Sequence, residues 1–146
     1  MDNFFLLSYA DEEQNIKIEI SNRGSNNRYT LKKYLGIPML VAQKETLFAN
    51  KLAALIGRKN VAMRDIYDVY YFAKNNWDID KEALKFFTAK NIKEQLKKSI
   101  QRIEEMNNKN ILQGLGEVLS EKDKKWAKKN LKQETLFLLK SYLSLE

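Results

Sequence analysis

The first forty residues are patterned as short strands. Residues 3–9 are rich in β-forming side chains, and residues 15–20 alternate between isoleucine and charged side chains. An alternation with a period of two is typical of a half-buried strand, and the polar residues 10–14 between these stretches fit a hairpin loop. Residues 37–41 form an apolar run whose proline favours an edge strand or the entry to a strand. The pattern predicts a small sheet, and residues 29–37 remain ambiguous.

From residue 43 the period becomes helical. Residues 43–57 carry leucines on one side and alanines that allow close approach, and Gly57 fits the end of this helix. Residues 62–74 repeat apolar side chains at the i, i+3, i+4, i+7 spacing of a second helix. Residues 80–146 are patterned as helices throughout. Good N-terminal caps precede three of them: Asp80, Asn91 with Glu94 three residues later, and Ser120 with Asp123.

These patterns predict an α+β fold. A small N-terminal β-sheet is followed by a helical C-terminal region, and we expect the division to separate residues 1–78 from residues 79–146. No internal repeat or low-complexity segment interrupts the chain.

The composition excludes several kinds of chemistry. The chain of 146 residues has no cysteine and no histidine, which removes disulfides, thiolate or histidine metal sites and catalytic triads that use histidine. No apolar run approaches the roughly 18 residues of a membrane span, and the N-terminus is a poor signal peptide. We therefore expect a cytoplasmic protein without a membrane partner, whose chemistry depends on carboxylates, lysine, arginine, tyrosine or a metal with oxygen ligands.

The net charge of +7 is concentrated in residues 81–146. A basic half favours an anionic partner, nucleic acid first, although lysine-rich helices can also serve solubility alone. Within this half a basic stripe with helical spacing can follow a phosphate backbone, or it can be an ordinary solvated face. The stripe consists of Lys122, Lys125, Lys129 and Lys132.

Charged side chains also stand beside the apolar positions of the two helices at 43–74. Lys51 and Arg58 share one side of the first helix, and Asp65 and Asp68 share one side of the second. If the helices pack antiparallel, Lys51 and Asp65 face one cleft near the strand that carries Glu19. The alternatives are a surface ion pair between the neighbouring Arg64 and Asp68, and an aspartate in the first turn favoured by the helix dipole.

The same residues carry a resemblance to a known family. Three stretches carry the resemblance: ETLFANKLAALIGR, MRDIYDVYYF and the strand IKIEI. The chain resembles the AbiEii/AbiGii-type nucleotidyltransferase toxins of bacterial abortive-infection and toxin–antitoxin systems. The resemblance covers roughly residues 10–75. The matching positions are Lys17, Glu19, Ile20, Glu45, Ala49, Lys51, Leu52, Ala54, Leu55, Arg58, Arg64, Asp65 and Asp68.

The resemblance implies a function. It identifies residues 1–78 as a partial nucleotidyltransferase-like core and residues 79–146 as a basic helical region. Such enzymes transfer a nucleotide from an NTP to a hydroxyl of RNA or tRNA, use Mg²⁺, and have a cognate antitoxin protein. The implied catalytic residues are Lys51, which binds the triphosphate, Asp65, which orients that lysine or acts directly, and Glu19, which places or deprotonates the hydroxyl. The implied nucleotide- and phosphate-binding residues are Lys17, Arg58 and Arg64.

One motif of the family is missing. A glycine–serine turn followed by Asp-x-Asp supplies the two main metal ligands in such enzymes, and neither part precedes the strand at 15–20. We interpret Asp78-Ile79-Asp80 as a loop and a helix cap, so the metal ligands are unknown. Two alternatives follow: a non-catalytic module that binds RNA or an antitoxin, and a site that an upstream segment or chain completes.

Overall fold

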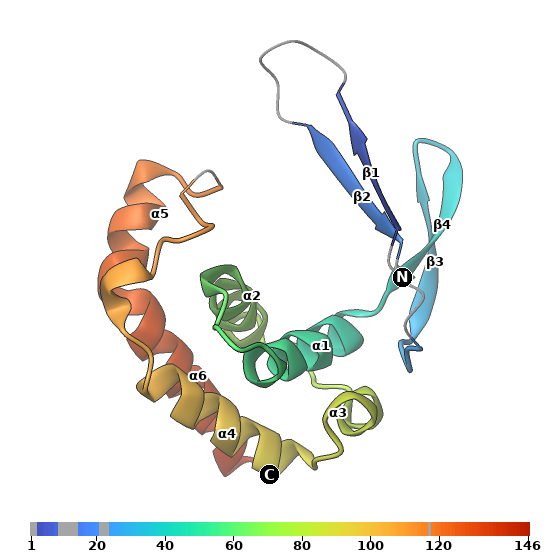
Figure 1. Ribbon diagram of the computed structural model, residues 1–146. Coiled ribbons are helices and arrows are strands. Elements are labelled where there is room, and N and C mark those ends of the chain that lie inside the picture. The colour runs from blue at the N-terminus through green and yellow to red at the C-terminus, as the bar shows by residue number, and fades with distance from the viewer. Residues whose placement is uncertain (1–2, 9–14, 21–23, 117) are drawn as a thin grey trace.

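The computed structural model describes residues 3–8, 15–20, 24–116 and 118–146. Four strands come first: β1 (Asn3–Leu7), β2 (Ile16–Ile20), β3 (Tyr29–Tyr34) and β4 (Ile37–Ala42). The helices that follow are α1 (Lys44–Gly57), α2 (Met63–Lys74), α3 (Lys81–Thr88), α4 (Ile92–Glu104), α5 (Glu121–Trp126) and α6 (Lys132–Ser144), with a 3-10 turn η1 (Asn108–Asn110) after α4 and a π-helical segment η2 (Ala127–Leu131) between α5 and α6. The α+β class is confirmed (Figure 1).

The strands pair as two separate antiparallel hairpins. β1 pairs with β2, and β3 pairs with β4, so the described strands form two sheets of two where the sequence suggested one. The ambiguous stretch at 29–37 contains β3 and a tight turn in which Leu35 and Gly36 both have positive φ, 49° and 81°. Two such residues in a row make the turn that matches the twist of a hairpin. The predicted loop at 10–14 lies outside the described residues.

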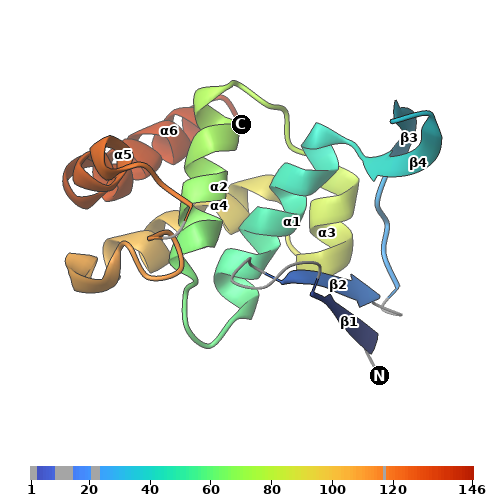
Figure 2. The same cartoon turned by 90° about the horizontal axis from the view of Figure 1, so that it is seen from above.

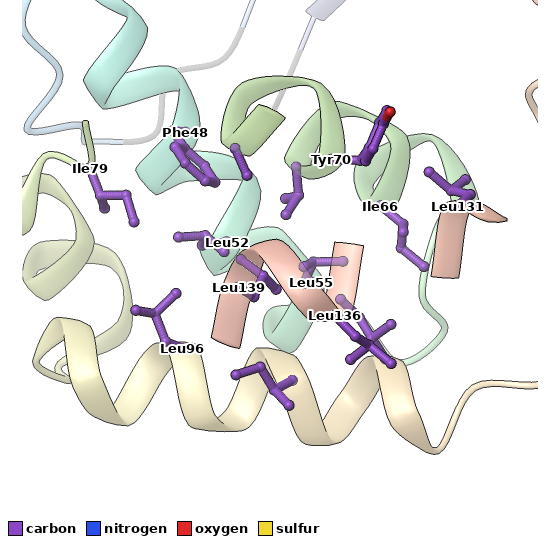
Figure 3. Close-up of a cluster of buried hydrophobic side chains, with 14 of the residues drawn as sticks. Phe48, Leu52, Leu55, Ile66, Tyr70, Ile79, Leu96, Leu131, Leu136 and Leu139 are labelled. Atoms are coloured by element: carbon purple, nitrogen blue, oxygen red, sulfur yellow. The ribbon is translucent and has the colours of Figure 1, made fainter. Parts of the chain in front are cut away.

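The buried core is helical. The largest fully buried side chains come from helices or the segments that join them, and the described strand side chains are exposed, apart from the half-buried Ala42. Phe48, Leu52 and Leu55 of α1 lie in one cluster with Leu96 of α4 and Leu139 of α6 (Figure 3). The hairpins therefore project from a body that the helices hold together without them.

Helices on both sides of residue 78 share this core. α1 packs against α2, α3 and α4, and α6 packs against α2 and α4. Figure 2 shows α2 between α1 and the arc formed by α5 and α6. The expected division at 78/79 therefore falls within one continuous packing arrangement.

The predicted caps are present, and Asp80 does more than cap its helix. Asn91 and Glu94 form a capping box at α4, and Ser120 caps α5. Asp80 accepts hydrogen bonds from the backbone N–H of residues 82 and 83 at the start of α3. Its other oxygen accepts from the Thr46 hydroxyl at 3.0 Å, and both side chains are buried. The helix-cap interpretation of Asp78-Ile79-Asp80 is confirmed for Asp80.

No helix within the described ranges is long and apolar enough to cross a membrane.

Candidate functional site

Four charged side chains meet between α1 and α2. The two helices run in opposite directions and are joined by residues 58–62 (Figure 2). The Lys51 ammonium lies 3.0 Å from Oδ1 of Asp65 and 2.7 Å from Oδ2 of Asp68. Nη1 of Arg58 lies 3.1 Å from Oδ2 of Asp65. We call these four residues the Lys51–Asp65 cluster.

Helical phase explains why they converge. Lys51 and Arg58 stand two turns apart on the side of α1 that faces α2, and Asp65 and Asp68 stand one turn apart at the start of α2. The first turn of α2 also favours a carboxylate because the positive end of the helix dipole lies there. The Arg64–Asp68 alternative is not what forms: Asp68 pairs with Lys51.

Asp65 is the buried centre of the cluster. Its side chain is 1% exposed, whereas those of Lys51 and Arg58 are 32% and 45% exposed. A buried carboxylate is costly unless it is paired and hydrogen-bonded. Lys51 donates a hydrogen bond to Oδ1. Arg58 is close enough to Oδ2 for an ion pair but is not aligned as a hydrogen bond, and Oδ2 accepts none from the described residues.

The lysine is held in its charged form. Partial burial by itself lowers the pKa of Lys51, but hydrogen bonds and charge attraction from Asp68 and Asp65 outweigh it. The pKa of Lys51 therefore ends above its ordinary value. An ammonium that keeps its proton at neutral pH can bind an anion but does not act as a base there.

Lys17 and Glu19 lie elsewhere. Both are on β2, where their side chains form an ion pair with each other and are largely exposed. Among the described residues, Lys51 forms its ion pairs with Asp65 and Asp68. The structure thus brings together Lys51, Arg58 and Asp65, and places Lys17 and Glu19 on the β1–β2 hairpin that extends from the helices (Figure 1).

Arg64 lines an open pocket beside the cluster. The pocket has a volume of about 750 Å³ and lies under the loop that joins α1 to α2, between the start of α2 and the end of α4. We call it the loop pocket. Its basic lining residues are Arg58, Lys59, Arg64 and Arg102.

Sequence reasoning missed Arg102. It lies on α4, and its Nη2 donates to the backbone carbonyls of Lys59 at 2.6 Å and of Arg58 at 3.4 Å. No local signal marks it, because an arginine on the polar side of an amphipathic helix is ordinary. Only the packing of α4 under the loop makes it part of a site.

The basic stripe is divided between three segments. Lys122 and Lys125 are on α5, Lys129 is in the π-helical segment, and Lys132 begins α6. The Lys132 ammonium donates to the carbonyls of Glu104 and Met106 at 2.8 and 2.7 Å, so it closes the end of α4. The other three extend along an exposed helical surface.

Within the described ranges, no three side chains of the kinds that bind metals come close enough together to hold an ion. The two carboxylates of the Lys51–Asp65 cluster are already matched by two cations. They therefore do not fit a two-metal site without further ligands.

A family model described as nucleotidyl transferase AbiEii toxin, type IV toxin–antitoxin system, matches residues 3–137, and the chain belongs to that family. The match extends well past the resemblance seen at 10–75 and takes in the helical half. Searches of curated proteins and of solved structures find no match.

Membership implies a nucleotidyltransferase toxin that works with an antitoxin partner and uses NTP and metal in general.

Proposed function

We propose that this chain takes part in the transfer of a nucleotide from an NTP to a hydroxyl of RNA, with tRNA as the acceptor class, and that Lys51 binds the triphosphate. The observation that carries the proposal is the convergence of Lys51 and Arg58 on the buried carboxylate of Asp65. A lysine held charged and fixed in direction is suited to a phosphate oxygen.

The donors of the cluster are only partly used. An ammonium can donate three hydrogen bonds. Among the described residues, Asp65 and Asp68 take two of those from Lys51. The guanidinium of Arg58 touches Asp65 through one nitrogen and is 45% exposed. Lys51 and Arg58 can therefore bind phosphate while Asp65 holds them in place, which makes Asp65 a positioning residue.

The transfer itself forms a bond between the acceptor oxygen and the α-phosphorus, breaks the bond to pyrophosphate, and releases the hydroxyl proton. We assign Glu19 to place that hydroxyl or take its proton, with Lys17 beside it. This role requires the β1–β2 hairpin to approach the Lys51–Asp65 cluster when the acceptor binds. Lys122, Lys125, Lys129 and Lys132 are proposed to bind the RNA backbone.

Mg²⁺, when bound, would neutralise the triphosphate. The described carboxylates do not by themselves form a site that could hold the ion.

The test uses the purified chain with Mg²⁺, labelled NTPs and total tRNA. We expect label to enter the RNA with wild type and with Lys85→Ala, which removes an exposed lysine on α3, but not with Lys51→Ala. Circular dichroism at the assay temperature verifies that each variant is folded. Labelling that survives in folded Lys51→Ala would refute the assignment of Lys51.

A second candidate function is a non-catalytic module that binds RNA or the antitoxin. Two observations favour it: the described carboxylates do not gather at a metal site, and both hairpins expose large apolar side chains such as Phe4, Ile18 and Leu40. Apolar surface of this kind marks an interaction site. RNA retained on the protein without any labelling supports the RNA-binding form. Capture of the co-expressed antitoxin, lost in Phe4→Ser, supports the antitoxin-binding form.

A further inference from the structure

The loop pocket is a concave surface with an excess of positive charge. Arg58, Lys59, Arg64 and Arg102 line it, and Glu105 is its single lining carboxylate among the described residues. Glu105 accepts a hydrogen bond from Gln101 at 2.8 Å, on its own helix. Basic side chains in a hollow create a stronger local potential than the same charges on a flat surface.

Arg102 is fixed in this pocket by the chain it supports. One terminal nitrogen bonds the carbonyls of residues 58 and 59, and Nε is enclosed without an acceptor among the described residues. The other terminal nitrogen takes part in no hydrogen bond between described residues. A planar guanidinium held in this way is pre-organised for an oxyanion, because little freedom remains to be lost.

Arg64 provides a second cation, from the start of α2. It stands in the first turn of α2, is exposed, and makes no ion pair with any described residue. The pocket also meets the N-terminus of the 12-residue α2, where Ala62 supplies no side-chain cap. The first N–H groups of a helix lack intrahelical acceptors and attract anions. The Asp65 N–H already donates to the Ala62 carbonyl at 2.9 Å, so the N–H groups of residues 63 and 64 are those that add to the two arginines.

We propose that the loop pocket binds a phosphate group, with Arg64 and Arg102 as its contacting side chains. The phosphate can belong to a free phosphorylated ligand or to a nucleic-acid backbone, which present the same chemistry. Binding here does not depend on nucleotide transfer at the Lys51–Asp65 cluster. A carboxylate ligand fits less well, because a phosphate offers more oxygens to several donors at once.

Two probes distinguish the sources. Inorganic pyrophosphate is titrated while amide shifts are followed by NMR, and a fluorescein-labelled oligouridylate RNA is titrated by anisotropy. Arg64→Gln removes an exposed charge and should leave the fold intact, and Lys85→Gln is the matched control outside the pocket. Arg102→Lys keeps the positive charge but lacks the planar guanidinium with its several N–H donors. The thermal unfolding midpoint of this variant shows whether it is folded.

We expect Arg64→Gln and Arg102→Lys each to weaken binding of at least one probe by roughly tenfold, the effect of losing one charge-assisted hydrogen bond. Lys85→Gln should change it by less than about twofold. If the two arginine variants weaken the binding of pyrophosphate alone, the natural ligand is a free phosphorylated molecule. If they weaken the binding of RNA alone, the ligand is a nucleic-acid backbone. If they weaken both, the pocket binds either source of phosphate. Equal effects of Arg64→Gln and Lys85→Gln on both probes overturn the proposal.

This outcome is separable from the proposed transfer. Stabilisation of the thermal midpoint by NTP with Mg²⁺ should be lost in Lys51→Ala and kept in Arg102→Lys if the loop pocket holds a backbone phosphate. If Arg64→Gln weakens the binding of RNA while Lys51→Ala still gains stability from NTP, the pocket stands and the assignment of Lys51 fails.

Discussion

Replacing Lys51 by methionine should destabilise the fold through the carboxylate that it leaves behind. The side chain of Asp65 is 1% exposed, and Lys51 is the described residue that gives it a hydrogen bond. Methionine keeps most of the stem of lysine and its packing but removes the ammonium. Arg58 remains 3.1 Å from the other oxygen, so the carboxylate keeps one cation.

The magnitude follows from burial. Removing one partner of a fully buried pair costs about 3–5 kcal/mol. Lys51 is 32% exposed and Arg58 remains, so we expect a loss of about 2 kcal/mol in the free energy of unfolding for Lys51→Met. Asp68→Asn removes the other, more exposed partner of Lys51, and should cost less than about 1 kcal/mol.

The assay is urea unfolding followed by circular dichroism. It compares the single variants Lys51→Met and Asp65→Asn with the double variant Lys51→Met/Asp65→Asn, and Asp68→Asn is measured alongside them. Because the double variant has no charge left buried at residue 65, its loss should be smaller than the sum of the two single losses by about 1 kcal/mol or more. Losses that add, or a loss for Lys51→Met no greater than that for Asp68→Asn, would show that the buried charge does not control stability here.

Three further predictions test the same structure. Asp80→Ala removes the cap of α3 and the acceptor of the buried Thr46 hydroxyl, which keeps only the hydrogen bond it accepts from the Arg28 N–H. We therefore expect a loss of about 2–3 kcal/mol in urea unfolding, and a loss below about 0.5 kcal/mol would contradict it. Leu52→Ala in the core should cost about 2–5 kcal/mol in urea unfolding, whereas Leu40→Ala on exposed β4 should stay within about 0.5 kcal/mol. The folded pKa of Lys51 is raised above the unfolded value of 10.5, so its stabilisation is complete below that pH and is lost as pH rises through the folded pKa. Wild type should therefore lose more stability than Lys51→Met does as the pH rises above about 10.5, and equal slopes in unfolding titrations would refute this.

The Lys51–Asp65 cluster balances two cations with two carboxylates, so by itself it offers no excess charge to a triphosphate. The excess lies next to it, in the loop pocket, and Arg58 lines that pocket while pairing with Asp65. A phosphorylated ligand near Lys51 would therefore meet its strongest attraction from the side of the α1–α2 loop. This arrangement joins the two proposals in space while leaving each open to its own test.

The sequence by itself determined the features that depend on neighbours along the chain. The period of two at 15–20 and the helical period from 43 specified the element types, and Asp80, Asn91 and Ser120 capped the helices as predicted. These are interactions between residues two to four positions apart, so local chemistry is enough to settle them. The facing of Lys51 toward Asp65 followed from the same helical phase, once two consecutive helices pack side by side.

The tertiary structure decided what depends on residues far apart in sequence. The alternation of apolar and polar residues could not predict that the strands divide into two hairpins. A period of two shows which side chains share one face of a strand, but not which strand pairs with which. Arg102 reaches carbonyls 43 and 44 positions away, and Lys132 closes α4 from 26 and 28 positions away. Such contacts exist only after the helices pack, since each basic residue alone has the signature of a solvated helix face. The loop pocket is for this reason a property of the fold.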